Sequence, residues 1–323
     1  MISNRKRKIL ILGGAGFVGQ NLTRFLLRRG AGAVTIVDSL DPLFGSTRES
    51  LSDIVDKITF IQGDIRDPKL LKRVIPGADV IFNCVGQTSH PHSLIDPFLD
   101  ADINCIGTLR VLTAVRDFNP KARVIFTGSS TVVGRGEHPV VDETHPEAPL
   151  DIYSAHKGVA EKYHRIFHTV YDIPTVVLRF ANLYGPYGKN DPSFGFVNHF
   201  LGQAIEGKPI IVWGDGAQTR NVLFIEDACE ALMQAAEHQK LVGTTHFVVH
   251  DDHHTVREVA EAIAETFGGR VESVPWPDVR RRIDVESVRI SGARFQKLTG
   301  WRPKHSLRQG LERTKKMFKQ KSK

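Results

Sequence analysis

Two side chains with acid–base chemistry, Tyr153 and Lys157, lie four positions apart in the segment YSAHK. Residues at this spacing share one face of a helix. A phenol in water loses its proton at about pH 10, but a neighbouring ammonium group favours the phenolate. Tyr153 is therefore a candidate base toward a substrate hydroxyl, although Tyr and Lys also meet by chance on helix surfaces.

Hydroxyl side chains gather earlier in the chain, in the segment FTGSSTVVG at residues 126–134. Ser129, Ser130 and Thr131 can donate hydrogen bonds to a sugar oxygen. A polar turn is the structural alternative, because Ser and Thr are common in turns. Together with a nucleotide-binding fold, these hydroxyls strengthen a functional interpretation of the Tyr–Lys pair.

A glycine-spaced turn occupies residues 8–19, KILILGGAGFVG, between an apolar run and an amphipathic helical pattern. Gly13 permits a tight turn, Gly16 lets backbone amides approach a pyrophosphate, and Gly19 lets the helix lie close to the sheet. A plain connector is the alternative for glycines alone. The flanking strand and helix favour a dinucleotide site.

The helix start at Phe17 and Val18 adds free N–H groups at the positive end of a helix dipole, which favours an anion. A second apolar run ends at Asp38, 19 positions after Gly19. An acid there accepts hydrogen bonds from the adenosine ribose and repels a 2′-phosphate. The cofactor predicted is therefore NAD rather than NADP.

Two further segments belong to the predicted cofactor site. Asp64 in GDIRD can accept a hydrogen bond from an adenine amine, and Ile65 beside it is included among the cofactor-binding residues. A loop or helix cap is an equal explanation for Asp64. Residues 83–86 are small and leave room for ribose and nicotinamide, or simply form a close-packed turn.

The elements that must position these residues alternate between short apolar runs and helical patterns, which predicts an α/β fold of the Rossmann type, a doubly wound parallel sheet with its ligand at the carboxyl edge. Strands are expected at residues 9–12, 34–37, 58–61, 80–83, 123–127 and 175–178, and helices at 17–29, 68–75, 97–118 and 153–171.

The second half of the chain has glycine- and proline-punctuated loops between shorter elements. Helices are expected at 196–206, 227–237, 256–267 and 307–318, and a strand at 210–213. We expect a NAD-binding domain over residues 1–180, to which residues 219–250 return, and a smaller α/β substrate lobe over 181–323.

Composition limits the class of protein. The 323 residues include three cysteines, none in a C-x-x-C pair, so we expect buried free thiols and no metal site. No apolar run is long enough for a membrane span and no apolar signal core follows the N-terminus, so we expect a cytoplasmic protein with no membrane partner. The net charge of +7 comes from the two chain ends, and we expect no nucleic-acid partner.

The sequence resembles the extended short-chain dehydrogenase/reductase family, the NAD-dependent nucleotide-sugar epimerases and dehydratases. The resemblance covers nearly the whole chain and rests on a set of segments: GGAGFVG, Asp38, GDIRD, NCIGT with Asn104, FTGSSTVVG, YSAHK, LRFANLYGP, GDGAQTRNVLFIEDA and GWRP.

This resemblance implies roles for individual residues. Ser129, Tyr153 and Lys157 would be the catalytic trio, with Lys157 also holding the nicotinamide ribose, and Asn104 would help to order the active-site helix and a water. Asn182 and Arg220 would hold the diphosphate of a nucleotide-sugar substrate, to which a guanidinium is well matched. Arg281 and Asp284 would reach the nucleotide. We also expect a homodimer.

Departures from the family pattern limit the assignment. Val133 replaces a usual Tyr, which puts packing against substrate or cofactor in doubt, and Gly128 removes a supporting hydroxyl. Dehydratases carry an Asp-Glu pair where this chain has Ser130 and Thr131, and related decarboxylases typically carry a Glu at the second position. A hydroxyl cannot replace a carboxylate in the elimination.

The sequence therefore favours C4 epimerisation of a UDP-hexose or a related sugar nucleotide, with NAD reduced only transiently. A dehydratase, decarboxylase or reductase of the same family remains an alternative. A catalytically silent NAD-binding protein is an alternative of another class, given Gly128 and Val133. The base, the sugar and the oligomeric state do not follow from the sequence.

Overall fold

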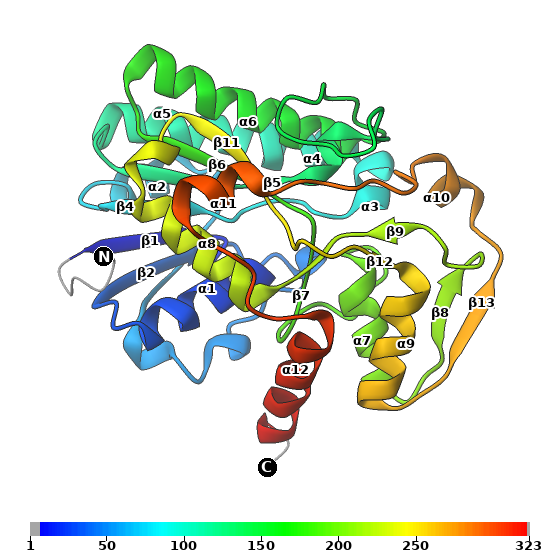
Figure 1. Cartoon of the computed structure of the whole chain (residues 1–323). Coiled ribbons are helices and arrows are strands. Elements are labelled where there is room, and N and C mark those ends of the chain that lie inside the picture. Colours follow the sequence, from blue (N-terminus) through cyan, green and yellow to red (C-terminus); the bar gives the residue numbers. More distant parts are fainter. Residues whose placement is uncertain (1–6, 322–323) are drawn as a thin grey trace.

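The structure, a computed structural model, describes residues 7–321, and the remaining residues of the two basic chain ends lie outside the described residues. Seven parallel strands form the central sheet in the order β11-β6-β5-β4-β1-β2-β3 (Figure 1). The strands are β1 (Lys8–Leu12), β2 (Ala33–Asp38), β3 (Thr59–Gln62), β4 (Val80–Asn83), β5 (Arg123–Ser129), β6 (Thr175–Phe180) and β11 (Thr244–Val248). The strand order reverses beside β1, so the doubly wound α/β fold is confirmed.

Helices cover both faces of this sheet, which explains why its central strands are apolar throughout. One face carries α2 (Pro68–Val74), α5 (Thr108–Phe118) and α6 (Ile152–Tyr171), and the other carries α1 (Phe17–Arg28), α8 (Ile225–Glu237) and α11 (Ala293–Thr299) (Figure 1). In the register, Ile11 of β1 lies between Ile36 of β2 and Phe82 of β4, and all three are fully buried.

The single helix expected over residues 97–118 is wrong in detail. It is divided into α4 (Pro97–Ala101), a π-helical turn (Asp102–Gly107) and α5, and the short α3 (His90–Ile95) precedes it. A π turn widens the helix by one residue, and such turns are frequent at functional sites. Here the turn places Asn104 in the protein interior.

The second half of the chain adds shorter elements beside the carboxyl edge of the sheet (Figure 1). They are β7 (Asn182–Tyr184), α7 (Phe196–Ile205), β8 (Ile210–Trp213), β9 (Thr219–Arg220), β10 (Val222–Phe224), β12 (His254–Thr255), α9 (Val256–Phe267), β13 (Val271–Val274), α10 (Asp278–Arg282) and α12 (Leu307–Lys321). β7 pairs with β10, β8 with β13 and β9 with β12. Several of these strands are too short to leave a periodic pattern in the sequence. Short 3-10 turns lie at Pro42–Phe44, Glu49–Leu51, Val55–Lys57, Ser130–Val133 and Gln239–Leu241.

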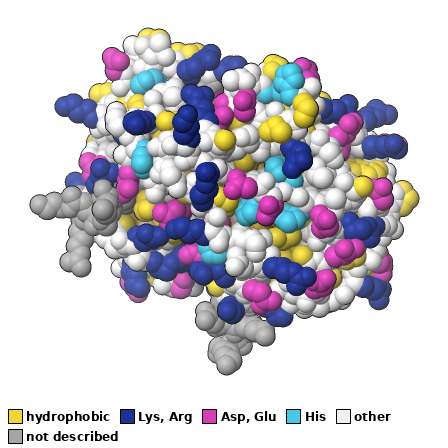
Figure 2. All heavy atoms as spheres, viewed as in Figure 1, with side chains coloured by type: hydrophobic (Ala, Val, Ile, Leu, Met, Phe, Trp, Pro, Cys, Tyr) yellow, Lys and Arg dark blue, Asp and Glu magenta, His cyan; other side chains and the backbone are white. Residues whose placement is uncertain are grey.

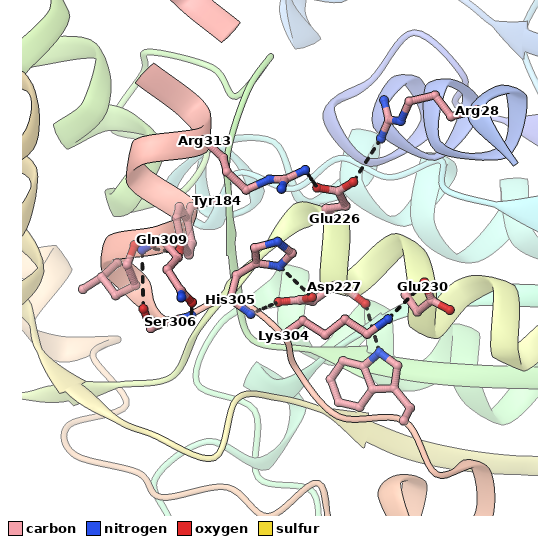
Figure 3. Close-up of polar contacts among 12 residues, drawn as sticks. Arg28, Tyr184, Glu226, Asp227, Glu230, Lys304, His305, Ser306, Gln309 and Arg313 are labelled. Atoms are coloured by element: carbon pink, nitrogen blue, oxygen red, sulfur yellow. Dashed lines mark hydrogen bonds and ion pairs between the residues drawn. The ribbon is translucent and has the colours of Figure 1, made fainter. Parts of the chain in front are cut away.

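The C-terminal segment is fastened to the start of α8, as Figure 3 shows. Asp227 accepts hydrogen bonds from the backbone N–H of His305 at 3.1 Å, while its other oxygen lies 2.9 Å from the His305 ring. Glu226 forms ion pairs with Arg28 of α1 and Arg313 of α12. The Tyr184 hydroxyl of β7 donates to the Leu307 carbonyl at 3.2 Å. α12 is therefore tied to both the sheet layer and β7.

The surface carries mixed charge. Figure 2 shows Lys and Arg side chains interspersed with Asp and Glu over the face turned to the viewer. Part of the basic C-terminal segment is paired with the protein body, because Arg308 contacts Glu265 and Arg313 contacts Glu226. Within residues 7–321, no helix is long and apolar enough to cross a membrane.

Candidate active site

A cavity opens at the carboxyl edge of the sheet, bordered by the ends of the strands from β1 to β6. It brings together most of the residues predicted for the site: Gly13, Gly16, Phe17, Val18, Asp38, Asp64, Ile65, Ser129, Tyr153, Lys157 and Asn182. Of the other predicted residues, all within the described range, Gly19, Asn104, Arg220, Arg281 and Asp284 do not line this cavity.

The glycine turn is shaped by close backbone contacts. Gly13 has a φ of 77°, and a Cβ built there would lie 2.9 Å from the backbone of Cys84 and Val85. A Cβ on Gly19 would lie 2.1 Å from the Gly13 carbonyl oxygen. These positions therefore admit no side chain without movement of the backbone, which agrees with the roles predicted for Gly13 and Gly19.

The helix that follows the turn offers its amides to the cavity. Gly16 is the N-cap of α1 and has no side chain to occupy the first-turn N–H groups, and the first turn carries no acidic residue. Phe17 and Val18 line the cavity directly. Uncapped amides at the positive end of a helix form a ready anion site.

Asp38 closes the far end of the cofactor region and is 8% exposed. Its carboxylate accepts hydrogen bonds from the N–H groups of Ala15 and Leu40, both at 2.9 Å, so it also braces the glycine turn. Burial raises the pKa of Asp38, and these hydrogen bonds and the charge of Lys189 act in the opposite direction. Lys189 lines the same cavity and was not predicted, because it comes from the loop after β7 and no local pattern marks it.

Asp64 lines the cavity but is already engaged. Its carboxylate accepts from the Arg66 backbone N–H at 2.8 Å and from the Arg66 guanidinium at 2.6 to 3.0 Å. Burial alone would raise the pKa of Asp64, but the contacts with Arg66 lower it. The helix cap that was the alternative belongs instead to Asp67, the N-cap of α2.

Tyr153 and Lys157 lie on the first turns of α6 and both face the cavity, with 8% and 3% of their surface exposed. Burial raises the pKa of the Tyr153 phenol, and the charges of Asp151, Asp100 and Glu161 add to this, whereas a hydrogen bond with Ser129 lowers it. Burial lowers the pKa of Lys157 to about 8. In the protein, burial of Tyr153 therefore has a larger effect on its pKa than the phenolate-stabilising effect that we expected from Lys157.

The hydroxyls at the end of β5 form a connected set. Ser129 Oγ lies 2.8 Å from Thr131 Oγ1, and Ser154 Oγ donates to the same Thr131 oxygen at 2.8 Å. Ser130 lines the cavity beside them. Thr131 therefore links the strand end to α6 through neutral groups.

Asn104 is buried, with 2% of its surface exposed. Its amide donates to the Gln87 carbonyl at 2.9 Å and to Asp100 at 3.0 Å, while its side-chain oxygen is buried without a protein partner. A buried acceptor of this kind suits a bound water. Asn104 thus joins α4 to Gln87, which directly follows the strand-end segment at residues 83–86.

The two departures from the family pattern have separate structural explanations. A Cβ on Gly128 would lie 2.7 Å from Oε1 of Glu161, a buried carboxylate that pairs with Arg179. The space of the missing side chain is therefore filled by Glu161. Val133 is buried in a small apolar cluster with Phe247 and lies away from the cavity.

The residues predicted for the substrate are arranged less directly. Asn182 lines the cavity and donates to the Asn221 carbonyl at 2.9 Å. The Arg220 guanidinium is paired with Asp284 and donates to the Glu286 and Thr219 carbonyls. Arg281 is exposed on α10. The structure thus brings Arg220 and Asp284 together as an ion pair, and neither residue lines the cavity.

His90 is another lining residue that the sequence did not indicate. Its Nδ1 lies 2.5 Å from Oδ2 of Asp151, the N-cap residue of α6, and its ring packs edge-on against Tyr153. Only the packing of α3 against α6 creates this contact, so no spacing in the sequence could have found it.

A parallel sheet with a glycine turn, an acid at the end of β2 and a Tyr–Lys pair in one cavity defines the class of dinucleotide-dependent enzymes that act on carbinols. Within that class, the chain belongs to the NAD dependent epimerase/dehydratase family, whose sequence profile matches residues 9–249. The predicted family and the prediction of NAD are confirmed.

Individual relatives cover nearly the whole chain. A UDP-glucose 4-epimerase from Mycolicibacterium smegmatis is 30% identical over 321 residues, which span 98% of this chain and 99% of that protein. A dTDP-glucose 4,6-dehydratase from Xanthomonas campestris is 30% identical over 332 residues, with 94% and 91% covered. The solved UDP-glucose 4-epimerase of Thermus thermophilus in complex with NAD has a TM-score of 0.86 at 29% identity, with 97% and 99% covered. Because both reactions occur among relatives, the reaction of this chain has to be argued from its site.

The residues present fit NAD. The crowded Gly13, the uncapped amides of α1 and the buried Asp38 together form a cradle for a pyrophosphate and an adenosine ribose. Tyr153 and Lys157 line the same cavity.

Proposed function

We propose that this protein inverts C4 of a UDP-hexose or a related sugar nucleotide through a transient 4-keto sugar. The observation that carries this proposal is that Ser129, Tyr153 and Lys157 line one cavity together with the neutral Ser130 and Thr131. By the family resemblance, Ser130 and Thr131 stand where dehydratases carry their acids. The hydroxyls support oxidation of a carbinol and supply no acid or base for elimination.

Each member of the trio has a separate task in this proposal. Tyr153 accepts the proton of the C4 hydroxyl, and Ser129 holds the same sugar oxygen through its hydrogen bond. Lys157 binds the nicotinamide ribose and places its positive charge near Tyr153. NAD, when bound, supplies the hydride acceptor and returns the hydride, so that it ends each cycle unchanged.

The substrate diphosphate is proposed to bind at Asn182 and Arg220, and the nucleotide near Arg281 and Asp284. Because Arg220 is paired with Asp284, its guanidinium has to exchange part of that pairing for the diphosphate. A bidentate match to phosphate oxygens supports this exchange.

We also keep as a proposal the division of the chain into a NAD-binding domain over residues 1–180, joined by 219–250, and a substrate lobe over 181–323. The pairing of β11 with β6 supports the return of the later segment to the sheet.

We propose a homodimer formed through α4, α5 and α6. α4, α6 and the π turn between α4 and α5 expose large apolar side chains: Phe98 is 85% exposed, Ile106 40%, Ile166 47% and Val170 60%. α5 packs beside α6, so the apolar residues can form one self-complementary surface. Sedimentation of the wild type and of Val170→Glu tests this: a dimer that the substitution weakens supports it, and a monomeric wild type contradicts it.

The reaction is tested by incubation with UDP, dTDP, GDP and CDP sugars, followed by chromatography that resolves epimers and by mass measurement. The expected product has the mass of the substrate, and in deuterated water its C4 hydrogen stays protium, because it travels as hydride. A product lighter by water or carbon dioxide would identify a dehydratase or decarboxylase, stoichiometric NADH a dehydrogenase, and inactivity across the panel a silent binding protein.

A further inference from the structure

His90 is a titratable side chain in the cavity that has no task in C4 epimerisation. The side chain is 32% exposed, and its ring centroid lies 4.7 Å from that of Tyr153. The backbone N–H of Tyr153 also donates to Ser93 Oγ at 3.1 Å, so α3 and the start of α6 hold each other in place. His90 therefore has a fixed position next to the proposed base.

Asp151 orients the imidazole. Its Oδ2 lies 2.5 Å from His90 Nδ1, and its Oδ1 accepts the Ser154 N–H at 2.7 Å as the N-cap of α6. With Nδ1 held by a carboxylate, Nε2 is the nitrogen left for chemistry in the cavity. An imidazole whose second nitrogen is fixed by a carboxylate is the usual arrangement of a general base in enzymes.

The chemistry left for such a base is limited by the intermediate. Tyr153 and Ser129 account for the proton on the C4 oxygen. Once C4 is a ketone, the remaining acidic hydrogens of the sugar are those on the neighbouring carbons, C3 and C5. Ser130 and Thr131 are neutral hydroxyls and supply no base toward them.

We propose that His90, oriented by Asp151, is a second catalytic base that removes and returns a proton on C3 or C5 of a bound 4-keto sugar nucleotide. This inference rests on the proposed sugar-nucleotide substrate and deepens it. The C–H bond breaks, its electron pair forms the C=C bond of an enolate whose charge lies on the C4 oxygen, and the proton goes to Nε2. Return of a proton from the imidazolium restores the ketone, on the same face for exchange or on the opposite face for inversion.

The test supplies the ketone directly, so that no hydride transfer is required. The protein is incubated in deuterated water with dTDP-4-keto-6-deoxyglucose or its UDP counterpart, which carry no leaving group at C6. Deuterium at C3 and C5 is followed by NMR and mass spectrometry. The wild type should exchange one of these hydrogens well above the rate in buffer.

The variants separate base chemistry from structure. His90→Asn keeps an amide nitrogen near the position of Nδ1 and removes Nε2, so exchange should fall by about 100-fold or more. Asp151→Asn keeps an N-cap side chain but removes the charge, and exchange should fall by about tenfold. His92→Asn is the matched control, since His92 lies on the same short helix but not in the cavity, and it should exchange like the wild type.

Two results would overturn the inference: no exchange by a wild type shown by calorimetry to bind the keto sugar, or unchanged exchange in His90→Asn. The proposed function fails separately. If no sugar nucleotide is epimerised at C4 but exchange occurs and depends on His90, the C4 proposal falls and the second base stands. If C4 epimerisation occurs but no exchange is seen, the C4 proposal stands and the second base falls.

Discussion

The proposed cofactor end and the proposed substrate end of the site are built from different materials. The cofactor end is made of backbone: the turn at Gly13 and Gly19 and the free amides of α1 are fixed by contacts that leave no room for side chains. The proposed substrate end depends on charged side chains outside the cavity lining, and its proposed cation, Arg220, is paired with Asp284.

This difference has a physical consequence for binding. A backbone cradle is already in its binding geometry, so a ligand loses little by ordering it. An Arg–Asp pair has to be partly exchanged for the ligand, which makes affinity at that end depend on how well the new partner competes. Cofactor binding should therefore tolerate changes of surface charge better than substrate binding does.

The largest effect is expected where the two ends meet, from Tyr153→Phe. The variant keeps the ring packing against His90 and removes the acid–base hydroxyl, so turnover should fall by about 10² to 10⁴. Binding of NAD and of sugar nucleotide, measured by calorimetry, should persist. Tyr163→Phe on the same helix is the control, and near-normal turnover in Tyr153→Phe would exclude this tyrosine as the base.

Arg220→Ala should weaken the substrate end alone. Loss of a charged, bidentate partner costs about 1.5 to 3 kcal/mol, or roughly 10- to 150-fold in sugar-nucleotide affinity. NAD affinity should change little, because Arg220 does not line the cofactor region. Arg220→Lys keeps the positive charge but loses the bidentate guanidinium. Its sugar-nucleotide affinity should lie between those of the wild type and Arg220→Ala. Equal loss of both ligands would indicate general disruption instead.

Gly19→Ala should damage the cofactor end alone. The added methyl would lie 2.1 Å from the Gly13 carbonyl oxygen, and such overpacking costs about 1 to 3 kcal/mol. We expect weaker NAD binding in titrations and a lower unfolding temperature, with sugar-nucleotide affinity less affected. Unchanged NAD affinity in a folded variant would show that the turn is not the cofactor site.

The smallest effect is expected from Asp38→Ala, which should reduce the preference for NAD over NADP by about fivefold to tenfold. The carboxylate faces a 2′-phosphate with like charge, but Lys189 on the same wall already offsets part of that repulsion. Titration of both cofactors measures the ratio. Asp38→Asn retains a hydrogen-bond acceptor for the Ala15 and Leu40 amides but removes the negative charge. It therefore distinguishes the effect of the charge on cofactor preference from the effect of the hydrogen bonds that hold the glycine turn. Equal affinities in the wild type would remove Asp38 from this role.

The same contrast explains what the sequence could predict. The glycine turn, Asp38 and the Tyr–Lys pair depend on local geometry, such as a strand followed by a turn or a four-residue helical spacing, and the structure brings them together in one cavity. The Arg220–Asp284 pair, by contrast, joins residues 64 positions apart, and its formation depends on how β9 lies against the segment after α10.

The site residues that the sequence did not indicate also depend on contacts between segments far apart in the chain. His90 reaches Tyr153 only through the packing of α3, and Lys189 reaches Asp38 from a loop far along the chain. The π turn around Asn104 was also missed, because its sequence has the same amphipathic pattern as an unbroken helix.

The attachment of α12 also bears on the order in which the protein is completed during synthesis. β7 carries Asn182, and the neighbouring Tyr184 is held by the Leu307 carbonyl, while a Cβ on Gly310 would lie 2.2 Å from the Tyr184 hydroxyl. A nascent chain thus has the glycine turn and the trio long before it has the helix that supports the opposite wall. Because domains fold as they emerge, the glycine turn is made well before α12, but the central sheet is complete only when β11 has paired with β6.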